Sequence, residues 1–270
     1  MKPERTEAIH TKNLKIILVS AFIIIFAVDG TAAAGGPLGP PQPVLKEAGG
    51  LHTGIGYGYR EDQYENGTEN VVRQNQFYSQ LGYGAKNWEI DARIGGSDLE
   101  ISDAFRSTQA STTTSKVDFE DHWKLFGTLG AKGFYPISQT FGIGAFLQGS
   151  YYFSDFTDHV SGVYNGAPFT IELKAKNLWN VNFGVGLQGT IADNIKLYIG
   201  PFLYYSEARI SQSGNIPGLE FSAGDTTIRN KTKSGGFGGV NIPLGKGFHL
   251  NAEGQYSERL SVGAAVTYSY

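Results

Sequence analysis

The chain contains no cysteine in its 270 residues. This absence excludes disulfide bridges, zinc–thiolate sites and a cysteine nucleophile. The net charge is only −3 at pH 7, so the chain has no basic excess of the kind that indicates nucleic-acid binding. After residue 50 the apolar residues show no useful run of 3.6-residue periodicity, which excludes a fold built on amphipathic helices. The remaining choice is an all-β fold.

An uncharged apolar run covers residues 16–28, and thirteen residues are too few for a spanning helix, which needs roughly 20. Lys12 and Lys15 form a basic flank before the run, and Ala32 to Ala34 offer a small-residue cleavage site after it. This arrangement predicts a signal peptide over residues 1–34, with an uncleaved membrane anchor as the alternative.

Residues 169–191 alternate between apolar and polar side chains for most of their length, which predicts a β-strand. The strand is far longer than the 5–6 residues usual in globular proteins. One predicted face carries Ile171, Leu173, Ala175, Trp179, Val181, Phe183, Val185, Leu187 and Ile191. The opposite face carries Glu172, Lys174, Lys176, Asn180, Asn182, Gln188 and Thr190. A long strand with one apolar and one charged face is typical of a transmembrane β-barrel.

The same pattern predicts about ten strands in all, over residues 51–60, 73–84, 87–101, 118–135, 140–154, 170–191, 195–211, 227–242, 247–257 and 259–270. Short connections rich in Asn, Asp, Gly and Pro alternate with long polar segments at 61–72, 102–117, 155–169 and 212–226. Short turns at one end and long loops at the other are typical of bacterial outer-membrane barrels. We therefore predict an all-β, transmembrane, antiparallel up-and-down β-barrel of about ten strands, with eight or twelve as alternatives. A soluble barrel with its apolar face turned inward is the competing interpretation.

Aromatic residues recur near the ends of the apolar stripes, where two interfacial girdles are expected. The candidates are Trp88, Trp123, Tyr135, Trp179, Tyr205 and Tyr270. The last strand, RLSVGAAVTYSY, alternates regularly and ends on Tyr270.

In this respect residues 51–270 resemble the bacterial outer-membrane β-barrel superfamily, the broad OmpA/OmpX-like group. The resemblance implies that the barrel-assembly machinery reads the terminal strand through Tyr270. It also implies an outer-membrane location, contact with outer-membrane lipid and lipopolysaccharide, and termini in the periplasm. We expect a monomer that binds no nucleic acid.

If the apolar stripes face lipid, the alternate side chains face the lumen. The charged lumen candidates are Glu89, Asp91, Arg93, Lys124, Glu172, Lys174, Lys176 and Glu253. Because unpaired buried charge is costly, we expect most of them to form a cross-barrel network of ion pairs. Small residues on neighbouring strands favour a narrow water path instead. Aromatic residues such as Phe146, Tyr198 and Phe202 also take the inward parity, where they would plug that path.

The sequence contains only weak indications of a catalytic or ligand-binding motif. The glycine-rich segments do not open helices, so no phosphate-binding loop is predicted. Two acidic groups with histidine lie near the expected outer rim, at 118–122 and 155–159. They resemble the rim of omptin proteases in general location, and the strand count matches as well, but the surrounding motifs of that family do not. We therefore predict no enzyme, no catalytic residues, no cofactor and no metal.

The sequence thus divides into a signal peptide (1–34), a Pro/Gly-rich lead-in (35–50) that stays in the periplasm or enters the barrel mouth, and the barrel (51–270). We predict a structural protein or a small or gated channel with a mixed-charge lumen. A rim-active hydrolase and an adhesin-like surface binder are the alternatives.

Overall fold

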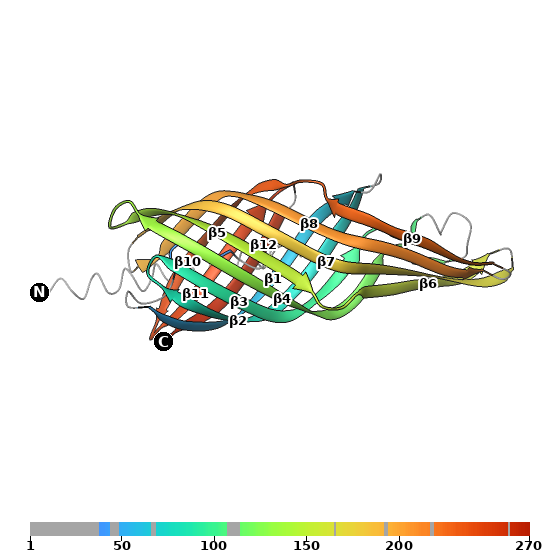
Figure 1. The fold of residues 1–270 in the computed structure, drawn as a ribbon, viewed down its shortest axis with the longest axis horizontal. Helices are drawn as coiled ribbons and strands as arrows, with labels where there is room; N and C mark the ends of the chain where they lie inside the picture. The colour runs from blue at the N-terminus through green and yellow to red at the C-terminus, as the bar shows by residue number, and fades with distance from the viewer. Residues whose placement is uncertain are drawn as a thin grey trace, which may run out of the picture.

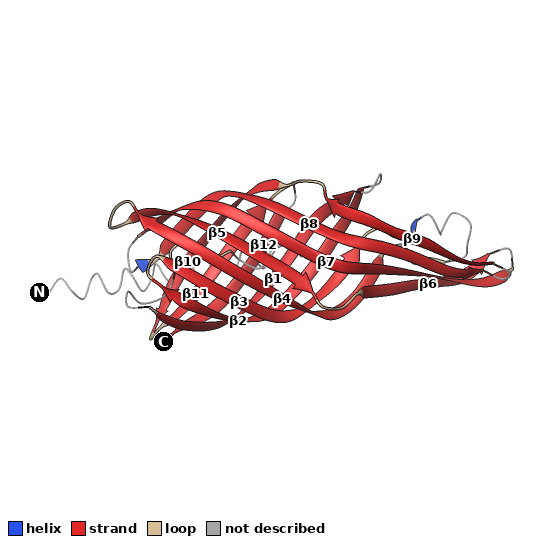
Figure 2. Ribbon diagram, viewed as in Figure 1, coloured by secondary structure: helices blue, strands red, loops and turns tan. Residues whose placement is uncertain are grey.

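The computed structural model describes residues 38–43, 49–65, 69–106, 114–164, 166–191, 194–216, 219–258 and 260–270. The signal peptide predicted over residues 1–34 lies outside this part of the chain. Within it, no helix is long and apolar enough to cross a membrane. Nearly all of the described chain is antiparallel strand (Figure 2). The strands are β1 (Gly50–Glu65), β2 (Glu69–Ala85), β3 (Trp88–Ile101), β4 (Phe119–Pro136), β5 (Phe141–Tyr152), β6 (Phe156–Tyr164), β7 (Ala167–Thr190), β8 (Lys196–Ile216), β9 (Leu219–Asn230), β10 (Ser234–Gly245), β11 (Phe248–Tyr256) and β12 (Leu260–Ser269).

Ten of these strands close into a ring in the order β1-β2-β3-β4-β5-β7-β8-β10-β11-β12. The ring closes where β1 pairs with β12, from His52 opposite Ser269 to Tyr59 opposite Val262. The predicted antiparallel barrel of about ten strands is therefore confirmed. The connections after β2, β4, β7 and β10 are short and lie at one end of the barrel, which we call the turn end. The C-terminus lies at the same end (Figure 1).

The other two strands, β6 and β9, continue the wall beyond the opposite end of the barrel. Both β5 and β6 pair with β7, and both β9 and β10 pair with β8. The four strands β6 to β9 form a projection beyond the barrel (Figure 1). We call this projection, together with the tips of β1 to β4, the extension. The predicted long loops at 155–169 and 212–226 are therefore wrong, because most of those residues are strand. Their polar composition reflects exposure to water on the outer face, and pairing with β7 and β8 supplies the regular backbone.

The predicted loop at 61–72 is also mostly strand, since β1 and β2 pair as far as Glu65 opposite Glu69. Of the predicted loop at 102–117, residues 107–113 lie outside the described chain.

A β-bulge in β7 exchanges the two faces of this long strand. Lys176 pairs with Arg209 and Trp179 with Glu207, so Asn177 and Leu178 together oppose the single residue Ala208. Asn177 has a φ of +51°, a conformation that asparagine tolerates better than most residues. On the extension side of the bulge, Ile171 and Ala175 are buried, whereas on the barrel side Phe183 and Leu187 are exposed.

The predicted single apolar face of residues 171–191 is thus wrong for its first part. Ile171, Leu173 and Ala175 point inward and belong to, or pack against, the core of the extension. Glu172, Lys174 and Lys176 consequently lie on the outer face, with side chains about a third exposed. The physical reason is the change of solvent along the strand: lipid makes apolar side chains face outward, and water makes them face inward.

Around the barrel, large apolar side chains cover the outer surface, while the inside holds most of the buried polar side chains together with aromatic rings. Exposed members of this apolar belt include Leu51, Ile55, Phe77, Leu81, Ile90, Ile94, Leu129, Leu147, Leu187, Ile199 and Leu203. Aromatic side chains border the belt. At the turn end the rings of Tyr83 and Trp88 meet edge to face, with 5.9 Å between their centroids. At the other end the rings of Trp179 and Tyr205 pack against each other, with 5.3 Å between their centroids.

The exchange of faces in β7 predicts which positions a water-soluble reagent reaches. Cysteine placed at Lys174 or Lys176 should react rapidly with a charged maleimide when the protein is folded in lipid vesicles. Cysteine at Ala175 should stay unreacted, because that side chain is 1% exposed. The chain has no native cysteine to interfere. Urea-unfolded samples, in which all three react alike, are the control, and faster labelling at position 175 would contradict the bulge.

Candidate functional site

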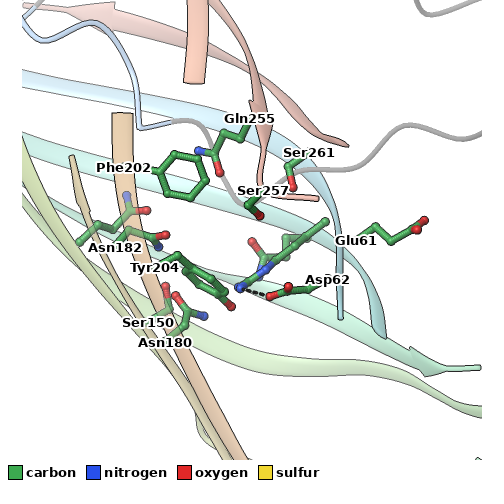
Figure 3. A pocket seen from close by; sticks show the side chains of 13 residues that line it. Glu61, Asp62, Ser150, Asn180, Asn182, Phe202, Tyr204, Gln255, Ser257 and Ser261 are labelled. Carbon is green, nitrogen blue, oxygen red and sulfur yellow. Dashed lines mark hydrogen bonds and ion pairs between the residues drawn. The ribbon is translucent and has the colours of Figure 1, made fainter. Parts of the chain in front are cut away.

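The barrel interior is the candidate site, and it consists of successive packed layers. Its middle layer is polar (Figure 3). The Arg60 guanidinium lies 3.1 Å from the Asp62 carboxylate and 3.8 Å above the centre of the Tyr204 ring. Both charged side chains are less than a tenth exposed. An arginine held by one carboxylate and one ring face is satisfied without bulk water.

The space around this ion pair is nearly filled. Amides and hydroxyls from several strands, including Gln76, Asn180, Asn182, Ser150 and Gln255, surround a cavity of about 20 Å³ (Figure 3). A cavity of that volume holds roughly one water molecule. Gln76 donates to the Tyr152 hydroxyl at 2.6 Å, and this hydroxyl donates to Gln74. This nearly filled layer of polar side chains, which we call the polar partition, lies across the barrel interior.

Toward the turn end lies a second layer, which is charged. Lys132 Nζ lies 2.9 Å from the Glu89 carboxylate, and His52 Nε2 lies 3.2 Å from the same oxygen. Arg93 lies 3.3 Å from Asp91. All five side chains are at most a tenth exposed, and the cavity they share measures about 30 Å³. The charges of opposite sign are paired within β3 and between β3 and β4, as buried charges must be.

Residues 38–43, which we call the strap, pass inside the barrel next to this layer. The backbone N–H groups of Leu38 and Gly39 both donate to the buried carboxylate of Glu253 at 2.9 Å. Gly39 has a φ of +81°, which glycine adopts without strain. These contacts place the described part of the lead-in, residues 38–43, inside the barrel.

The other end of the strap is held by side-chain contacts. Gln42 and Gln188 exchange two hydrogen bonds at 3.0 and 3.1 Å, and Lys196 donates to the Pro43 carbonyl at 3.3 Å. Leu38 packs in an apolar cluster with Phe146, Tyr198, Phe202, Tyr204 and Phe237. The strap is thus held in the turn half of the barrel by both polar and apolar contacts.

Two of the inward glycines lie under aromatic rings. A Cβ atom at Gly56 would lie 2.3 Å from the Tyr78 ring, and one at Gly239 would lie 2.4 Å from the Tyr198 ring. At these two positions the small residue is therefore matched by a large ring from a neighbouring strand. The inward aromatic side chains expected to plug the lumen, including Phe146, Tyr198 and Phe202, are indeed buried.

Beyond the polar layer, the extension closes the opposite end with an apolar core. Its buried side chains include Tyr64, Leu99, Phe105, Phe119, Phe126, Tyr152, Phe156, Phe169 and Leu178. The outer surface of the extension is polar, as expected in water. There Glu207 accepts from Tyr205 at 2.7 Å and from Arg229 at 2.9 Å, and these hydrogen bonds lower the pKa of Glu207.

The acidic groups near the rim bind backbone amides. Asp158 accepts from the backbone of Glu120 at 2.8 Å and from the ammonium of Lys116 at 2.7 Å. Asp121 accepts from the backbone of Thr157 at 2.6 Å, and Lys124 lies 3.1 Å from it. These carboxylates join β4 to β6. In the described chain, no three His, Asp or Glu side chains are arranged to hold a metal ion.

The residues predicted to line the lumen divide into three groups. Glu89, Asp91, Arg93 and Glu253 are buried inside the barrel. Lys124 lies at the rim beside Asp121. Glu172, Lys174 and Lys176 face outward, as described above, and do not join the lumen network. Among the girdle candidates, Trp88, Trp123, Tyr135 and Tyr270 are exposed, and Trp179 and Tyr205 are partly exposed.

Sequence reasoning missed the Arg60–Asp62 pair and the strap contacts. The pair had a usable signal, because both residues share the inward parity of Gly54, Gly56 and Gly58 along β1. The strap had none, since a proline-rich segment carries no periodicity that indicates its partners.

On the outside of the belt, an apolar groove of about 840 Å³ crosses β3, β4, β5 and β7. Ile94, Leu129, Leu147 and Val181 contribute to its lining, and outward Gly127 and Gly149 leave room for it. Trp179 and Tyr151 border it. The groove lies on the lipid-facing surface and is separate from the interior layers.

No protein-family model matches the chain, and no curated protein matches it. Similar solved structures are barrels of low identity. The translocator domain of the autotransporter NalP from Neisseria meningitidis is 11% identical, with a TM-score of 0.44 and coverage of 98% of each chain. The toluene transporter TbuX from Ralstonia pickettii is 12% identical, with a TM-score of 0.38, and covers 89% of this chain and 95% of its own.

The outer membrane protease OmpT from Escherichia coli is 11% identical, with a TM-score of 0.37, and covers 82% of this chain and 96% of its own. The fold is that of an outer-membrane β-barrel. This conclusion rests on the closed ring and the apolar outer belt of the chain itself.

The charged layer predicts a large stability effect at one lysine. Replacing Lys132 with alanine leaves Glu89 buried with His52 as its remaining close partner, and should destabilise the barrel by about 3–5 kcal/mol. The double variant Glu89→Gln/Lys132→Ala should recover part of this loss. Urea-dependent folding into lipid vesicles, followed by tryptophan fluorescence, measures both effects.

The control is Lys174→Ala, which breaks an ion pair on the outer surface and should cost about 0–1 kcal/mol. An unchanged urea midpoint for Lys132→Ala would contradict the assigned role of the charged layer.

Proposed function

We propose that this protein is a structural outer-membrane barrel whose lumen is closed and whose extension presents a β-sheet surface outside the cell. The observation that carries the proposal is the continuous filling of the interior. An apolar core, a polar partition, a charged layer and the strap follow one another along the barrel. The cavities in the polar and charged layers are about 20 and 30 Å³, and a larger cavity of about 450 Å³ lies among the turns at the turn end, with Gln42 and Gln188 in its lining.

The proposal includes an orientation and a processing step. Cleavage of residues 1–34 delivers the chain to the periplasm, and both ends of the mature protein stay there at the turn end. The extension then lies on the extracellular side. The mature barrel is a monomer, surrounded by outer-membrane lipid and lipopolysaccharide, and Tyr270 marks its last strand for the assembly machinery. The polar outer face of the extension and the exposed Tyr270 support this orientation.

A small gated channel is the second candidate, and the strap favours it. The strap is a short segment without strand structure, held by Glu253, Gln188, Lys196 and one apolar cluster. Its release would open the turn half of the lumen. We do not propose a rim hydrolase, because the rim carboxylates Asp121 and Asp158 are bound to backbone amides and to lysines.

Conductance of the folded mature protein in planar bilayers tests the proposal. The wild type should give no reproducible current steps, because both the polar partition and the outer core block ion flow. A variant with residues 38–43 replaced by a Gly-Ser segment of equal length should also be silent.

Steps in the wild type would overturn the closed-barrel proposal. Steps in the strap variant alone would replace it with the gated channel. Heat-dependent gel mobility checks that each sample is folded, so that an absence of current steps is not caused by misfolded protein.

A further inference from the structure

The extension contains a cavity that the closed lumen does not explain. It measures about 190 Å³ and lies between the tips of β1 and β2 and the inner face of the β7–β9 sheet. Its apolar lining comes from Val72, Ile101, Ala104, Phe119, Leu173, Ile210 and Ile228. It is at least six times larger than either lumen cavity.

The lining belongs to the packed core of the extension. Val72, Ile101, Phe119 and Ile228 are each less than a tenth exposed, and Leu173 and Ile210 pack against them. Protein interiors rarely leave voids larger than a water molecule. An apolar cavity of roughly 150 Å³ stays dry and accepts a molecule of the size of benzene. The volume and lining here therefore suit a monoaromatic molecule better than a cluster of water.

The lining also has a polar edge, formed by Glu65 and Asn70 beside the tip of the β1–β2 hairpin and by Gln212 on β8. Glu65 is exposed and the other two are partly exposed, so we take this edge as the mouth of the cavity. Tyr64 is also in the lining, and its hydroxyl is hydrogen-bonded to Ser206. The carboxylate of Glu65 accepts hydrogen bonds and repels anions. A neutral ligand with one donor group fits this edge, and a carboxylic acid in its ionised form does not.

We propose that the extension binds a small neutral aromatic molecule carrying one hydrogen-bond donor, with its ring in this cavity and its donor at the Glu65 edge. The site lies at the end of the barrel opposite the strap, so ligand reaches it without passing through the lumen. The proposal does not depend on whether the barrel conducts.

Phenol is the probe, and isoleucine methyl groups are the reporters. The protein is folded in lipid nanodiscs with labelled isoleucine methyls, and phenol is added while their NMR shifts are recorded. Ile101, Ile210 and Ile228 should shift and saturate together. Ile55, Ile94 and Ile199 face lipid, so they report only partition of phenol into the bilayer.

Benzoate tests the charge selection at the cavity mouth. It has a similar ring but is an anion at pH 7, and we expect it to bind at least tenfold more weakly than phenol. Toluene lacks the donor and should bind more weakly than phenol as well.

Variants that fill the cavity complete the experiment. Ile210→Phe and Ala104→Leu should each weaken phenol binding at least tenfold, as read from the remaining cavity methyls. Two different filled positions guard against the failure of one variant to fold, which heat-dependent gel mobility checks. Val163→Phe adds the same ring at an exposed position of β6 and should leave binding unchanged.

Three outcomes would overturn the proposal. The cavity methyls do not shift, or they shift only in proportion to the lipid-facing methyls, or the filled variants bind phenol as the wild type does. Binding of benzoate as tight as that of phenol would overturn the assigned role of the Glu65 edge.

Discussion

The pairing of β1 with β12 is the constraint on which the rest of the structure depends. Backbone groups that face lipid have no water to bind, so a sheet that crosses a membrane has to close on itself. Here the first and last strands complete the ring from His52 opposite Ser269 to Tyr59 opposite Val262. Closure gives every strand a fixed inward parity, and the inward side chains then have to pack against one another in a narrow interior.

That interior is filled because size and charge are matched between neighbouring strands. Large rings lie over glycines, as Tyr78 does over Gly56. Charges of opposite sign meet in pairs, as Glu89 does with Lys132. The strap adds backbone donors to the buried carboxylate of Glu253. Together these contacts fill the middle of the barrel, where the cavities of the polar and charged layers measure only about 20 and 30 Å³.

In the extension the surrounding solvent is water instead of lipid, and this changes which face of a strand carries the apolar side chains. Inside the membrane the apolar side chains face outward, and beyond it they face inward around a water-exposed sheet. β7 meets both conditions, and the bulge at Asn177 and Leu178 shifts its parity between them. A single residue thus converts a lipid-facing strand into one wall of an apolar core. The 190 Å³ cavity exists only because this second core is present.

The sequence by itself determined the antiparallel barrel, the outward stripe of residues such as Leu129 and Leu187, and the inward parity of Glu89, Asp91 and Arg93. Period-2 alternation is a local property of an extended chain, so it can be read without knowing which strands are neighbours. Only the tertiary structure decided that 155–169 and 212–226 are mostly strand, that Lys174 and Lys176 face outward, and that residues 38–43 lie inside. Each of these outcomes depends on a contact with another segment of the chain. β6 is a strand because it pairs with β7, and β9 is a strand because it pairs with β8. The bulge in β7 forms against β8, and the strap is held by Glu253. Polar composition indicates exposure to water, but it does not distinguish a loop from a strand paired above the membrane.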